Sequence, residues 1–135
     1  MAVIYFQNNY LTLYHHAAES LGHPVWTGFA SGDEHRNSVL ECVKLIQEEK
    51  PQLWLTDNRK MKAVRKADQD WFTQEIIPIM AASYLRKFAV LISEDIFNQM
   101  AVENIYQQTT KINNFEMKFF DNEALALAWL KQAAI

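Results

Sequence analysis

The sequence predicts a single α/β domain built on a mixed sheet of four to five strands with flanking helices. Three observations support this. The first thirty residues are strand-like, helical and strand-like patterns alternate after them, and no linker or repeat divides the chain. Such alternation is typical of a parallel sheet covered by helices, here with the amino-terminal strands as an antiparallel edge. Residues 1–135 are therefore expected to form one domain.

Three strands are expected first. Val3–Gln7 is a β-branched and aromatic run that ends at the turn-prone pair Asn8-Asn9. Tyr10–His16 alternates between apolar and polar residues, and Pro24–Phe29 carries Val25 and Trp26. Alternation with a period of two is the signature of a half-buried strand.

A helix is expected next. Ser31 and Glu34 have the spacing of a capping box, and the residue before Pro51 is disfavoured in the helical region, so the helix should end near Lys50. Leu53–Leu55 then forms a short buried strand that finishes in Thr56-Asp57-Asn58. The core-facing stripe of the helix is expected to be Val39, Leu40, Val43 and Ile46.

The second half continues the alternation. A start signal at Asp68 opens a helical region in which Pro78 predicts a kink or two short helices. Phe88–Ile92 is a continuous apolar run typical of a central strand. Ser93 is expected to cap a helix that runs to about Thr109. The last strand is Phe115–Phe120, and Asp121 is expected to cap the last helix.

Composition narrows the classes of function. The formal net charge is −3 and the pI is near 5.8, which argues against a general nucleic-acid binder. The sequence contains no apolar run of about 20 residues, so no membrane span is expected. The single cysteine, Cys42, and the lack of a signal-peptide pattern predict a cytoplasmic location.

The sequence contains no assembled catalytic or cofactor motif. It lacks a glycine-rich phosphate loop, so no cofactor is predicted. His15 and His16 are adjacent on a predicted strand and project to opposite faces. His35 and Cys42 share a helix face, but two ligands are too few for a structural zinc site, and we expect a surface histidine and a half-buried cysteine. No metal site and no enzymatic activity are therefore predicted.

Asp57 follows a buried strand, which is where ligands gather in open α/β sheets. A phosphoacceptor aspartate occupies such a place, but it needs a pair of acidic residues after the first strand, and Asn8-Asn9 stands there instead. The alternative is that Asp57 caps the turn or pairs with Arg59 or Lys60.

Two further features leave alternatives open. One is a run of basic residues from Arg59 to Lys66, which is either a docking patch for an anion or an acidic partner, or a solvated loop. The tryptophans are either core residues or the lining of a ligand cavity. The basic run comprises Arg59, Lys60, Lys62, Arg65 and Lys66, and the tryptophans are Trp26, Trp54, Trp71 and Trp129.

Several short strings resemble a known family. They are Trp26-Thr-Gly28-Phe29, Leu55-Thr-Asp57-Asn58-Arg59-Lys60-Met61, Asp68-Gln-Asp-Trp71 and Ala128-Trp129-Leu130-Lys131. Together they are similar to small bacterial stand-alone proteins grouped with STAS domains, also called SpoIIAA-like, and more distantly to the lipid-carrying CRAL-TRIO fold. The resemblance covers about Tyr10 to Gln132. It implies a mixed sheet packed against helices and an uncharacterised subfamily.

The sequence departs from that family at the phosphorylation site. Anti-sigma-factor antagonists carry a phosphorylated serine at the start of the helix after the buried strand. Ala67-Asp68-Gln69-Asp70 stands there in this chain, so no phosphoserine switch is carried over. Asp70 supplies either a fixed charge in place of the phosphate or the ordinary acidic residue of a helix start.

The leading hypothesis is a non-enzymatic protein-interaction or regulatory module that docks an unknown protein partner through the face around Asp57–Trp71. The alternative is a small-molecule or lipid-binding domain with an aromatic-lined cavity. A homodimer is compatible with either, whereas nucleic-acid and membrane partners are not expected. The predicted binding residues are Asp57, Asn58, Arg59, Lys60, Asp68, Asp70 and Trp71.

Overall fold

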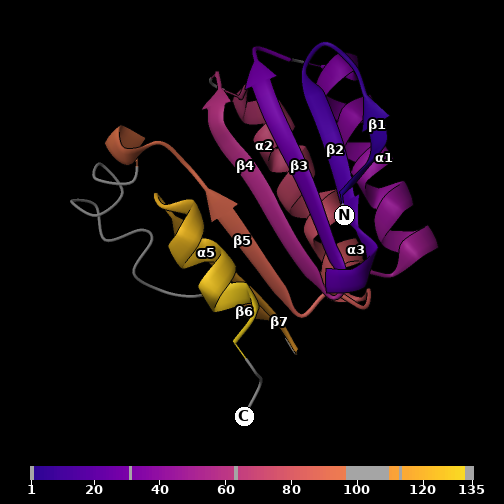
Figure 1. Ribbon diagram of the computed structural model, residues 1–135. Helices are drawn as coiled ribbons and strands as arrows, with labels where there is room; N and C mark the ends of the chain where they lie inside the picture. Colours follow the sequence, from indigo (N-terminus) through magenta and orange to yellow (C-terminus); the bar gives the residue numbers. More distant parts are fainter. Residues whose placement is uncertain (1, 31, 63, 97–109, 113, 133–135) are drawn as a thin grey trace.

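The computed structural model describes residues 2–30, 32–62, 64–96, 110–112 and 114–132. In that part of the chain a seven-stranded sheet has the order β1-β2-β3-β4-β5-β7-β6 (Figure 1). Its strands are β1 (Val3–Gln7), β2 (Leu11–His16), β3 (Leu21–Gly28), β4 (Leu53–Met61), β5 (Lys87–Leu91), β6 (Thr110–Ile112) and β7 (Phe115–Phe120). The helices are α1 (Asp33–Glu49), α2 (Lys66–Trp71), α3 (Ile77–Ala81) and α5 (Glu123–Leu130), with a 3₁₀ turn at Ala17–Glu19 and a π-helical turn at Phe72–Ile76.

The predicted mixed topology is confirmed. β1, β2 and β3 pair antiparallel, whereas β3, β4, β5 and β7 run parallel. The strand count exceeds the expected four to five. All three amino-terminal segments join the sheet, and β6 adds a second antiparallel edge beside β7.

Helices cover both faces of the sheet. In Figure 1, α1, α2 and α3 lie behind the sheet, and α5 lies in front of β5 and β7. Because side chains alternate along a strand, β5 serves two cores. Phe88 and Val90 belong to the larger core beside α1 and α3, and Ala89 and Leu91 belong to the smaller core beside α5.

The first helix begins and ends close to the expected positions. Its N-cap is Gly32 at φ 58°, and the predicted cap, Ser31, lies outside the described residues. The end near Lys50 is confirmed, with Lys50 itself in the left-handed region at φ 51°. Leu40 does not belong to the core-facing stripe, because it is 47% exposed. It lies about 100° around the helix from Val39, which is buried.

The strand expected at Leu53–Leu55 is longer, because β4 continues to Met61. Asp57 therefore lies within the strand and not after it. Between β3 and β4 the register shifts, since Val25 pairs with Asp57 but Thr27 pairs with Lys60. One extra residue in β4 is a bulge, which lets a polar stretch continue in the sheet.

Pro78 is accommodated by a change of helix type. The helical region from Lys66 to Ala81 contains a π-helical turn at Phe72–Ile76, directly before α3, which has Pro78 in its first turn. A proline lacks the amide hydrogen of a regular helix, and a helix start tolerates that loss. The expected interruption is thus a π turn followed by a short helix.

The predicted caps of the last two helices, Ser93 and Asp121, lie within the described residues. The Ile96 amide donates to the Ser93 hydroxyl at 3.4 Å, as expected for a cap, but residues 97–109 of the predicted helix lie outside the described residues. The last helix is capped by Asn122 and not by Asp121, because the Leu125 amide donates to Asn122 Oδ1 at 3.0 Å.

Gly22 on β3 determines where the indole of Trp54 lies. The two residues are paired across β3 and β4. A Cβ added at Gly22 would lie 2.1 Å from Cζ3 and 2.3 Å from Cε3 of Trp54. The ring therefore occupies the space that any other residue at position 22 would need.

Replacing Gly22 with alanine should destabilise the protein. Overpacking of this kind costs about 1–3 kcal/mol, because the ring or the strand must move. Urea unfolding followed by far-UV circular dichroism would measure the loss. In a Trp54→Leu background the same Gly22→Ala change should cost much less. An equal cost in both backgrounds would contradict the contact as its cause.

Candidate functional site

A cavity of about 850 Å³ lies between the sheet and the helices α1, α2 and α3. Most of its wall is aliphatic or aromatic. Ligand sites of small molecules have volumes of about 300–1,000 Å³ and are lined in the same way. Two of the four tryptophans, Trp26 and Trp54, line the cavity, together with Phe72, Phe88 and Phe119.

His35 lies in the first turn of α1 and is part of the cavity wall. It is 5% exposed, so the sequence-based expectation of a surface histidine is wrong. Its ring stacks on Trp26 with 5.6 Å between centroids, and its buried Nδ1 has no hydrogen-bond partner among the described residues. Burial lowers the pKa of His35, although Asp68 opposes the effect, so the imidazole is neutral at pH 7.

Cys42 also lines the cavity, two turns along α1 from His35. It is 7% exposed and not half-buried as expected. Burial raises the pKa of its thiol well above the ordinary value, and Glu41 adds to the rise. A thiol held neutral is a weak nucleophile and a weak metal ligand.

Asp68 joins α2 to the start of α1 at the same end of the cavity. Its carboxylate is fully buried and accepts three hydrogen bonds: from the Gly32 amide at 3.0 Å, from Arg36 Nε at 3.2 Å and from Arg65 Nε at 3.4 Å. The bond from Gly32 is the main reason why the pKa of Asp68 is below its ordinary value. The two arginines add to this, and together they outweigh the opposing effect of burial. The residue expected to open α2 therefore caps α1.

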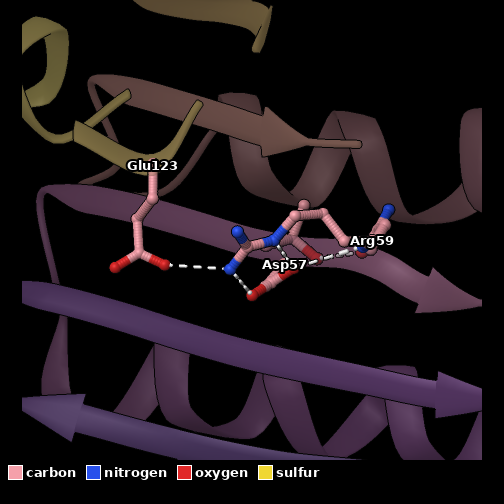
Figure 2. A network of polar contacts seen from close by, with 5 residues as sticks. Asp57, Arg59 and Glu123 are labelled. Atoms are coloured by element: carbon pink, nitrogen blue, oxygen red, sulfur yellow. Dashed lines mark hydrogen bonds and ion pairs between the residues drawn. The ribbon is translucent and has the colours of Figure 1, made fainter. Parts of the chain in front are cut away.

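Asp57 forms a separate network on the opposite face of the sheet (Figure 2). Arg59 Nε donates to Oδ1 at 3.0 Å and Nη2 donates to Oδ2 at 2.8 Å, and Nη2 also contacts Glu123 of α5 at 3.0 Å. Burial alone would raise the pKa of Asp57, but the hydrogen bonds from Arg59 hold it below the ordinary value. Both carboxylate oxygens are engaged, which favours the pairing interpretation over a phosphoacceptor.

The structure does not gather the predicted binding residues on one face. Asp57 and Arg59 lie on the α5 side, whereas Asn58 lines the cavity and its Oδ1 accepts a bond from Thr56 at 2.7 Å. Lys60 and Asp70 are exposed, and Asp70 pairs with Lys66 at 3.3 Å. Docking of a partner through the face around Asp57–Trp71 stays a prediction.

Trp71 stabilises the helix junction and does not line the cavity. Its ring is half-buried, and the guanidinium carbon of Arg36 lies 5.2 Å from its centroid. Cation–π contacts of this kind hold a cation in a fixed position. Trp71 thus orients the arginine that binds Asp68.

Sequence reasoning missed His35 as a cavity residue, although the signal was present. His35 is four residues before Val39 and eight before Val43, so it continues the buried stripe of α1 by one turn. Within the described residues, no three His, Cys, Asp or Glu side chains are grouped to hold a metal ion.

Residues 33–134 match the model of the family described as "Domain of unknown function (DUF7793)". The chain belongs to this family. No curated protein matches the sequence. No helix in the described part of the chain is long and apolar enough to span a membrane.

A solved structure shows the same fold. It is an uncharacterized protein of the DUF3478 family with a SpoIIAA-like fold from Shewanella loihica PV-4. The identity is 12%, the alignment covers 96% of this chain and 92% of that chain, and the TM-score is 0.55. The SpoIIAA-like fold implied by the sequence resemblance is therefore confirmed, and the likeness shows the fold alone.

Replacing Asp68 with asparagine should destabilise the protein at pH 7, because the amide loses one acceptor and leaves two arginines without their shared carboxylate. The pKa of Asp68 is depressed in the fold. Its contribution is therefore complete above the unfolded pKa of about 3.9 and is lost as the pH falls through the folded value. Urea unfolding at pH 7, 5 and 3.5 should show a gap between the two proteins that narrows toward acid.

Asp70→Asn is the matched control, since Asp70 lies on the same helix in an exposed pair with Lys66. Such pairs contribute about 0–1 kcal/mol, so this variant should unfold close to the parent at every pH. A gap for Asp68→Asn that does not change with pH would contradict the assigned role of the carboxylate.

Proposed function

We propose that this protein is a non-enzymatic binding protein that holds an apolar small molecule in the cavity between the sheet and α1, α2 and α3. One observation carries the proposal. The cavity of about 850 Å³ has an apolar wall that includes, among the described residues, one histidine, whose buried Nδ1 has no hydrogen-bond partner there. A wall of this kind with a few polar groups is the usual form of a small-molecule site.

The energetics of packing also favour a ligand. Protein interiors are close-packed, and voids larger than a water molecule are few. This cavity is partly open to solvent, so its apolar lining contacts water, and covering that lining with a ligand is favourable. A buried histidine nitrogen without a partner adds a desolvation cost. A ligand with an apolar body that covers the wall would offset the first of these costs.

Catalysis is a weaker interpretation of the same residues. A catalytic site needs a nucleophile or base together with a group that orients it. The Cys42 thiol has a raised pKa, and the carboxylate of Asp68 is occupied by Gly32, Arg36 and Arg65. His35 stacks on Trp26, and its Nδ1 has no hydrogen-bond partner in the described part of the chain. These environments suit binding better than proton transfer.

A regulatory role is compatible with binding. A ligand that binds the folded state stabilises it by RT ln(1 + [L]/Kd), and it would brace α1 and α2 against the sheet from inside. The exposed residues Lys60, Arg65 and Lys66 lie close in the sequence to Lys62, which lines the cavity. A change in the cavity could therefore alter the surface that the sequence predicts for a partner. Partner docking itself is a separate question.

Filling the cavity from α1 should abolish binding of an apolar probe. Val39 is 3% exposed and lines the cavity, so Val39→Phe would place a ring where the ligand body lies. Nile red, an uncharged apolar dye, should show saturable fluorescence with the parent protein. Its affinity for Val39→Phe should be lower by at least about tenfold, equivalent to about 1.4 kcal/mol.

Leu40→Phe is the matched control, because Leu40 is the next residue of the same helix and is 47% exposed. It adds the same ring on the outside and should leave Nile red binding unchanged. Equal binding by the parent and Val39→Phe, with both proteins folded by circular dichroism, would overturn the proposed site.

A further inference from the structure

The cavity has a polar end and an apolar end. β3, β4 and β5 run parallel, so their carboxyl ends meet at one edge of the sheet. Asn58 and Lys62 line the cavity at that edge, and His35 in the first turn of α1 lies there too. At the other end the lining residues Trp54 and Phe88 come from the amino ends of β4 and β5.

Further aliphatic side chains line the apolar end. Ile46, near the end of α1, and Met80 of α3 are each 2% exposed and line the cavity with Trp54 and Phe88. An elongated ligand would place its tail there and its head at the strand ends. Ligands in open α/β sheets bind beyond the carboxyl ends of the strands for the same topological reason.

The polar end carries an excess of positive charge. Lys62 lines the cavity, and Arg36 and Arg65 lie beside it through their bonds to Asp68. Asp68 is paired with the two arginines, and its carboxylate already accepts three hydrogen bonds. Asp68 therefore offers little to a cationic ligand, whereas Lys62 is exposed and can meet an anion.

His35 is a further polar residue of the cavity wall, in the first turn of α1. It is buried and its Nδ1 has no partner in the described part of the chain. A hydrogen bond between an imidazole and a charged oxygen is stronger than one between two neutral groups. A carboxylate pairs with an exposed lysine such as Lys62, and it can carry an apolar chain directly behind it.

We propose that the ligand is amphipathic, with a carboxylate head among His35, Asn58 and Lys62 and an alkyl tail that runs toward Trp54, Phe88 and Met80. This inference rests on the proposed function and adds the chemical class and the orientation of the ligand. From Asn58 to Trp54, β4 spans roughly 13 Å, a length covered by about ten carbon–carbon bonds of about 1.5 Å in a zigzag. An alkyl tail of about that length therefore fits along β4.

Three probes with the same tail and different heads test the inference. Dodecanoate, dodecanol and dodecyltrimethylammonium are titrated below their micelle concentrations into the full chain, with the fluorescence of Trp26 and Trp54 as readout. Dodecanoate should bind at least about tenfold more tightly than either of the others, because only its head is anionic.

Two variants test where the head group of the ligand binds. Lys62→Gln and His35→Phe should each weaken dodecanoate binding by about five- to tenfold and weaken dodecanol binding less, because only dodecanoate carries a charged head. Lys44→Gln removes an exposed charge on the outer side of α1 and should change neither affinity. If His35→Phe unfolds, Lys62→Gln alone still tests the charged contact, because Lys62 is exposed.

The outcomes separate this inference from the proposed function. Dodecanol or dodecyltrimethylammonium binding as tightly as dodecanoate, with loss of binding in Val39→Phe, would overturn the carboxylate head and keep the cavity as a ligand site. Loss of dodecanoate binding in Lys44→Gln equal to that in Lys62→Gln would also overturn it. If none of the three probes and no Nile red binds, both proposals are wrong.

Discussion

The carboxylate of Asp68 joins two helices whose bonded residues, Gly32 and Asp68, are 36 positions apart in the sequence. It satisfies the amide at the start of α1 and holds Arg36 and Arg65 at the junction with α2. The first turn of α1 presents His35 to Trp26, so the position of the histidine depends on that bond. A charged group that is fully buried is costly unless all its acceptors are used, and here its hydrogen bonds and two arginines meet the cost.

The two faces of the sheet differ in their polar contacts. On the face beside α5, Asp57, Arg59 and Glu123 tie β4 to the last helix. On the other face, the side chains of β4 point into the cavity. These charged groups join neighbouring elements, and the residues that line the cavity are mostly apolar. Many residues of the larger core also line the cavity, among them Trp26, Val43 and Phe88.

The sequence predicted the mixed sheet, the parallel order and most element positions, because local periodicity determines them. It placed Asp57 beyond the strand, since it could not show that a bulge lets the polar residues 57–60 remain in the sheet. It assigned Asp68 to its own helix, because a cap supplied from another part of the chain leaves no local pattern. His35 was missed as its stripe was traced only from Val39. Whether the tryptophans fill a core or line a cavity depends on how much space the packed side chains leave, and the order of residues in the sequence does not show that.

The contact between Gly22 and Trp54 has a consequence for the history of the family. Because the ring occupies the place of a missing Cβ, position 22 cannot gain a side chain while Trp54 is retained. A relative that has acquired a side chain at the position of Gly22 should have a smaller residue at that of Trp54. Because Trp54 walls the apolar end of the cavity, such a paired change would also alter the depth of the cavity. Covariation at these two sites would thus trace how the depth of the cavity has diverged among relatives of this chain.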